Sequence, residues 1–125
     1  KMLVGHAFVN PMRLLWPDRN PPPVVTVPVA VNTVQYPLPK PSRCYKLGRA
    51  LGKAIESFDE NLKVVVVGTG GMSHQLDGER AGFINKEFDL MCLAKLVDNP
   101  EALSSYSIDE IVRLAGTAVP RSSIG

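Results

Sequence analysis

Apolar residues follow two different spacings along the chain, and each spacing predicts one kind of secondary structure. Residues 24–31, VVTVPVAV, are rich in β-branched side chains and predict a buried strand. Pro28 lacks a backbone donor, so this strand should have an edge position or a bulge there. Residues 62–67, LKVVVV, predict a second strand that is buried on both faces, as in a parallel sheet.

Three other segments have the spacing and the capping residues of helices. Residues 43–58 place their apolar side chains on one face, and Ser42 is a plausible N-cap. Residues 86–97 predict a helix with Asn85 as its cap, and residues 107–115 open with a capping box. Strand, helix, strand, helix, helix is an α/β order, and its first three elements should form a right-handed βαβ unit.

The glycine-rich segment 68–75, GTGGMSHQ, follows the second predicted strand and is the most informative part of the chain. Its glycines allow the backbone to turn sharply and to approach a ligand closely. Sites in open α/β sheets lie beyond the carboxyl ends of strands, which predicts a site here. His74 would present an imidazole, the side chain best suited to acid–base catalysis near neutral pH. A tight turn followed by a surface histidine explains the same residues equally well.

Other chemical interpretations of this region are weaker. A P-loop needs Gly-Lys-Ser/Thr, and the dinucleotide fingerprint needs glycine where this chain has Ser73. Ser73 and His74 lack the G-x-S-x-G elbow of a nucleophilic serine. Arg80 lies in a charged turn that is either solvated or an anchor for an anionic substrate. Cys44 and Cys92 are expected to be buried thiols on the predicted helices.

Composition narrows the class of protein. The chain has 125 residues, 45% hydrophobic and 21% charged, which is typical of one globular domain. A net charge of +2 is too small to indicate nucleic-acid binding, and no apolar run is long enough to span a membrane. Two cysteines define no disulfide framework, so a reducing cytoplasmic setting is expected. The two termini, Lys1 and Gly125, suggest a piece of a longer protein.

Residues 64–85, VVVVGTGGMSHQLDGERAGFIN, resemble the catalytic subunit of the class III extradiol ring-cleaving dioxygenases. The resemblance is to the protocatechuate 4,5-dioxygenase beta subunit first and to the gallate dioxygenase type next. The resemblance extends over about residues 6–117 and includes residues 32–39, 43–48 and 98–100, whereas the tail 118–125 diverges. It implies an α/β fold in which residues 1–125 are a single partial catalytic domain. This domain would be a segment of an αβα sandwich with a mostly parallel or mixed central sheet.

The resemblance also implies a reaction and roles for both histidines. The family uses non-haem Fe(II) and O₂ to open the ring of a catecholic acid beside its two hydroxyls. His74 matches the family's histidine that acts as general base on the substrate hydroxyl and then as acid. His6 matches a pocket histidine that binds substrate or oxygen, although Gly5 replaces the usual aspartate before it.

The family's iron is held by two histidines and one glutamate, a facial triad. The two histidines precede the region present here, and Arg121 occupies the expected place of the glutamate. No metal ligand and no bound Fe(II) are therefore expected in this segment, which alone should be inactive. The complete enzyme would be cytoplasmic, with a small companion subunit or as a homo-oligomer. The expected substrate is a catecholic acid such as protocatechuate, opened by 4,5-cleavage. The alternatives are a truncated or degenerate non-catalytic homologue and a gallate-specific dioxygenase.

Overall fold

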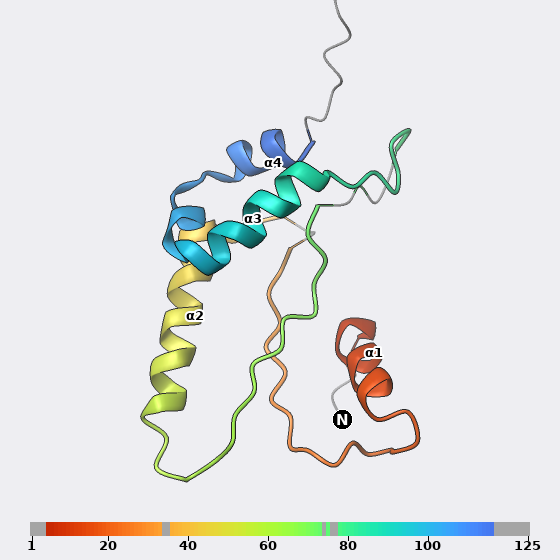
Figure 1. Cartoon of the computed structure of the whole chain (residues 1–125), viewed down its shortest axis with the longest axis vertical. Helices are drawn as coiled ribbons and strands as arrows, with labels where there is room; N and C mark the ends of the chain where they lie inside the picture. Colours follow the sequence, from red (N-terminus) through yellow and green to blue (C-terminus); the bar gives the residue numbers. More distant parts are fainter. Residues whose placement is uncertain (1–4, 34–35, 74, 76–77, 117–125) are drawn as a thin grey trace, which may run out of the picture. The chain divides into compact units, whose positions relative to one another are not determined.

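The computed structural model describes residues 5–33, 36–73, 75 and 78–116 of the chain, and half of these residues are in helices (Figure 1). The elements in chain order are α1 (His6–Leu15), α2 (Pro41–Glu56), α3 (Lys86–Asp98), the 3₁₀ helix η1 (Pro100–Ser105) and α4 (Ile108–Gly116). Within the described part of the chain, no helix is long and apolar enough to cross a membrane.

The three predicted helices are confirmed with small shifts at their ends. α2 begins one residue before the predicted cap Ser42, with Lys40 at the N-cap and Pro41 in the first turn. Proline suits this place because its fixed φ matches the helix and its missing N–H would have no partner there. The prediction that Ser42 caps the helix is therefore wrong, whereas Asn85 caps α3 as predicted.

The predicted central sheet is wrong for the residues that the structure describes, which contain no strand. Residues 24–31 and 62–67 are extended but belong to no ladder, so the βαβ unit does not form and the αβα sandwich is not observed. The side chains of Val25 and Val65 are 98% and 73% exposed. An extended segment needs a neighbouring strand to satisfy its N–H and C=O groups, whereas a helix satisfies them internally.

The chain divides into two compact units. Unit 1 consists of Lys1–Val31 and Val65–Gly71, and it contains α1 with two extended segments. Unit 2 consists of Asn32–Val64 and Met72–Gly125, and it contains the other helices. In unit 2, η1 packs against both α2 and α3, and α3 packs against α4.

Unit 2 also holds the most enclosed side chains. Among the described residues, Cys92 and Asn85 are the buried ones, with 6% and 7% of their surfaces exposed. Cys92 lies on α3, and Asn85 stands at the start of that helix. The interior of this unit is therefore centred on α3 and combines an apolar thiol with a polar amide.

Candidate functional site

His6, the predicted substrate-binding residue, is the first residue of α1 and is exposed. The helix begins after Gly5, whose carbonyl oxygen accepts hydrogen bonds from the N–H groups of Phe8 at 3.1 Å and Val9 at 3.2 Å. Gly5 has an extended backbone and provides no side-chain cap. A Cβ atom at position 5 would meet no atom within 4 Å, so no close contact of the described residues requires glycine there.

The glycine-rich turn differs from the prediction. Residues 68–71 are exposed and irregular, and a Cβ atom at Gly68 or Gly70 would meet no atom within 4 Å. Left-handed backbone occurs instead at Gly78 and Gly82, with φ of +83° and +86°. At these two positions a side chain would strain the backbone, so the sharp turning takes place further along the loop.

His74, the predicted catalytic residue, lies outside the described residues, but both of its chain neighbours are described. The Ser73 hydroxyl accepts a hydrogen bond from the Asn85 N–H at 2.8 Å and donates one to the Asn85 carbonyl at 3.3 Å. The Gln75 N–H donates to the Phe83 carbonyl at 3.1 Å, and the Gln75 carbonyl accepts from the Gly82 N–H at 2.8 Å. The two described neighbours of position 74, Ser73 and Gln75, are thus hydrogen-bonded to residues 82–85.

A second contact connects this loop to α3. The N–H of Ser73 donates to Oδ1 of Asp89 at 2.9 Å. Asp89 is half-buried and lies in the first turn of α3. A backbone donor bound to an ionised carboxylate makes a stronger hydrogen bond than one bound to a neutral group. Ser73 is therefore held through its hydroxyl and through its backbone.

Asn85 connects the start of α3 with the end of α4. Its Oδ1 accepts from the Phe88 N–H at 3.1 Å, and its Nδ2 donates to the carbonyls of Leu114 at 3.0 Å and Ala115 at 3.2 Å. One buried amide thus satisfies backbone groups that both helix ends would otherwise leave without partners. The sequence predicted the cap of α3, but it gave no sign of the contacts with α4.

Arg80 has a structural role in this loop. Its Nη1 donates to the carbonyl of Gly116 at 3.1 Å, and its guanidinium lies 4.1 Å from the centre of the Phe83 ring. A cation over an aromatic face is attracted by the ring quadrupole. These contacts favour the structural interpretation of Arg80 over the anchor for an anionic substrate.

The two cysteines differ in their surroundings. Cys92 is buried as predicted, and Cys44 is half-buried. Burial raises the pKa of the Cys92 thiol, and the nearby negative charge of Asp89 adds to this, whereas Lys95 acts in the opposite direction. Cys92 is therefore a protonated, poorly nucleophilic thiol at neutral pH.

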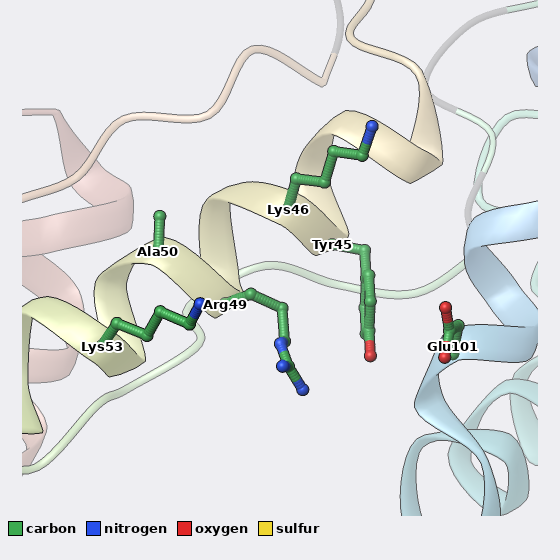
Figure 2. A pocket seen from close by; sticks show the side chains of 6 residues that line it. All are labelled: Tyr45, Lys46, Arg49, Ala50, Lys53 and Glu101. Atoms are coloured by element: carbon green, nitrogen blue, oxygen red, sulfur yellow. The ribbon is translucent and has the colours of Figure 1, made fainter.

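A shallow groove of about 430 Å³ lies between α2 and η1 (Figure 2). The side chains that line it are those of Tyr45, Lys46, Arg49, Ala50, Lys53 and Glu101. Its lining includes three cations and a single carboxylate, so the groove is basic, but all four charged side chains are exposed. Water and salt screen such charges strongly. The groove includes neither predicted site residue and has the character of a solvated helix face.

The described residues do not fit an iron site. No group of three or more His, Cys, Asp or Glu side chains in the described part of the chain is arranged to hold a metal ion. His6 stands at the start of α1, and the carboxylate of Asp89 is engaged by Ser73. A facial triad requires three converging donors. The described residues do not form such a triad.

Comparison with protein families gives a match over residues 1–122 to the catalytic LigB subunit of aromatic ring-opening dioxygenase. The chain belongs to this family of ring-opening dioxygenases. It is 48% identical to the gallate dioxygenase of Pseudomonas putida over 113 residues, which cover 90% of this chain and 33% of that protein.

More distant relatives are the 2,3-dihydroxyphenylpropionate/2,3-dihydroxicinnamic acid 1,2-dioxygenases. The enzyme of Photorhabdus laumondii is 36% identical over 74 residues, which cover 59% of this chain and 22% of that enzyme. The enzyme of Mycolicibacterium smegmatis is 40% identical over 73 residues, which cover 58% and 22%. The chain spans a third or less of the length of these relatives. The family resemblance seen in the sequence is confirmed.

Proposed function

We propose that this chain contributes to an extradiol dioxygenase that opens the ring of a catecholic acid with O₂. The observation that carries the proposal is the identity of 48% to a gallate dioxygenase over 90% of the chain. This similarity favours gallate as the substrate over protocatechuate, which the sequence motifs alone had placed first. The second group of relatives acts on dihydroxyphenyl acids, so an acidic catechol is the shared substrate class.

Within this proposal, His74 transfers protons and His6 binds substrate. An imidazole takes a proton from a substrate hydroxyl and returns it to a later intermediate without a large energetic cost near neutral pH. The motif of residues 68–75 supports the role of His74, because this motif is among the segments in which the sequence resembles the family most specifically. The exposure of His6 at the start of α1 supports its access to a ligand.

The remaining parts of the proposal concern the complete enzyme. We propose that Fe(II) is held by residues outside this segment, and that the 125-residue chain alone has no ring-opening activity. The complete enzyme would work in the cytoplasm, as a homo-oligomer or with a small companion subunit. Fe(II) would supply the coordination of the catechol and the activation of O₂.

A hybrid enzyme tests this function. The matched 113 residues of the Pseudomonas putida gallate dioxygenase are replaced by those of this chain, and O₂ uptake is measured with gallate, protocatechuate and 2,3-dihydroxyphenylpropionate. The expected result is ring opening of gallate above the other two acids. A folded, iron-loaded hybrid that consumes no O₂ with any of them would favour the non-catalytic homologue.

A further inference from the structure

One side of α2 carries more positive charge than the rest of the helix balances. Its cations, spaced three or four residues apart, are Arg43, Lys46, Arg49 and Lys53. Side chains at this spacing are neighbours on a helix surface, and like charges there repel each other. The acidic residue of α2 is Glu56 at its C-terminal end, which is at this spacing from Lys53 but not from the other cations. A partner that brings carboxylates to this side would therefore stabilise the helix.

Two neighbouring grooves run along this side of α2, with volumes of about 430 and 440 Å³, and both are lined by Tyr45, Arg49 and Lys53. At the edge of the first groove, the side chain of Tyr45 points towards Glu101 of η1 (Figure 2). Within the described part of the chain, no side chain forms an ion pair with Lys46, Arg49 or Lys53. The packing of the described residues therefore leaves the charged groups of this solvated surface accessible to a partner.

We propose that these two grooves form a docking surface for an acidic segment of another polypeptide. Carboxylates of the segment pair with Lys46, Arg49 and Lys53, and the planar guanidinium of Arg49 can bind one of them through two hydrogen bonds. An open, exposed surface suits an extended chain better than a small molecule, which binds in a cavity that encloses it. Gly48 and Gly52 leave open space beside the helix in the second groove, so the backbone of the segment can approach closely.

The distribution of charge favours a polypeptide over a nucleic acid. Nucleic acids carry a phosphate at every nucleotide and bind to larger basic surfaces. The chain has a net charge of only +2, and Glu101 and Glu56 each line one of the two grooves, where they repel phosphates. A polypeptide can place carboxylates on the cations and neutral side chains beside the two glutamates, which a uniform phosphate backbone cannot do.

Binding of a peptide of alternating glutamate and serine to the full 125-residue chain tests this proposal. Exposed cations often only keep a surface soluble, and binding would then depend on net charge alone. Arg49→Glu and the control Lys63→Glu change the net charge equally, and Lys63 is exposed and lines neither groove. In ¹H–¹⁵N spectra at low salt, the peptide should shift the amide signals of residues 45–53. Arg49→Glu should raise the Kd at least about fivefold, whereas Lys63→Glu should change it less than about twofold.

A peptide that shifts no amide signal of residues 45–53 would overturn the proposal, and so would equal losses of affinity in Arg49→Glu and Lys63→Glu. An oligothymidylate of the same charge that binds more tightly than the peptide would assign the surface to nucleic acid instead. Circular dichroism checks that each variant is folded. If Arg49→Glu does not fold, Arg49→Gln and Lys63→Gln give the same comparison, because glutamine removes the charge and suits a helix. These measurements do not depend on ring opening, so a failure of the proposed function leaves them unaffected.

Discussion

The loop and helices between Ser73 and Gly116 differ from the valine-rich segments 24–31 and 62–67 in how their backbones find partners. In the first region, Asn85 and Ser73 join the loop to the ends of α3 and α4 through side-chain contacts. In the second, the chain is extended and exposed and belongs to no ladder. Both regions are apolar in part, so hydrophobicity alone does not create structure. A segment also needs a local or neighbouring partner for its peptide groups.

Hydrogen exchange should reveal the largest difference between the two regions. The amides of residues 24–31 and 62–67 are expected to exchange at close to the rates of an unfolded chain. Those in the middle of α3 should exchange at least about tenfold more slowly, because they are bonded within a helix. Mass spectrometry of peptides from both regions measures this. Equal protection of the amides of α3 and of the two valine-rich segments would contradict this difference between the regions.

Asn85→Ala should produce the next largest effect, because it removes the cap of α3 and both side-chain contacts with α4. We expect a loss of about 2 kcal/mol in the free energy of unfolding, measured by urea titration of the helical signal. Asn85→Asp keeps the cap and should cost less. The exposed Asn61 supplies the control, since Asn61→Ala should change the stability little. An equal loss for Asn61 and Asn85 would contradict the role of the buried amide.

The reactivity of the two cysteine thiols tests how closely side chains pack around α3. Cys92 is 6% exposed and its pKa is raised, so alkylation at pH 8 should modify Cys44 first. A difference of at least about tenfold in rate is expected because the thiolate is the reactive form. Single Cys→Ser variants assign the two rates by mass spectrometry. Faster alkylation of Cys92 than of Cys44 would show that the side chains around α3 pack less closely than in the structure.

Loss of the capping box of α4 should have a smaller effect than the changes above. The N–H and hydroxyl of Ser107 both donate to Glu110 Oε2, at 2.7 and 2.9 Å, and they lower the pKa of that carboxyl. Because the folded pKa is depressed, the stabilisation is present above the unfolded pKa and is lost as the pH falls through the folded one. Carboxyl ¹³C titration should show Ser107→Ala raising the pKa of Glu110. Ser105→Ala should leave the pKa of Glu110 unchanged. Equal shifts of this pKa in the two variants would exclude the capping box.

The sequence was most informative where a local rule determines the structure. The cap at Asn85, the box at Ser107 and the apolar face of residues 43–58 each depend on neighbours within a few positions, and the three helices follow from them. α1 was not predicted, since Pro11 lies inside it and the surrounding prolines favour extended chain. η1 was also missed.

Nonlocal partners account for what the sequence could not predict. The two strand predictions required pairing that no described residue supplies, so the expected sheet was wrong. The contact between Ser73 and Asp89 joins residues 16 positions apart, and those between Asn85 and α4 span about 30. No spacing rule for a single element predicts such contacts. For the site, the sequence motif around His74 predicted the family of the chain, and the comparisons confirm this family. The catalytic role of His74 and the substrate-binding role of His6 remain predictions.

The most direct test of ring opening by this chain is O₂ uptake with gallate in the hybrid enzyme before and after His74→Gln. The parent hybrid should consume one O₂ for each ring opened. His74→Gln should lower kcat by at least about 100-fold at equal iron content, since the proton-transfer group is lost. A His74→Gln hybrid that opens gallate as fast as its parent would contradict the account.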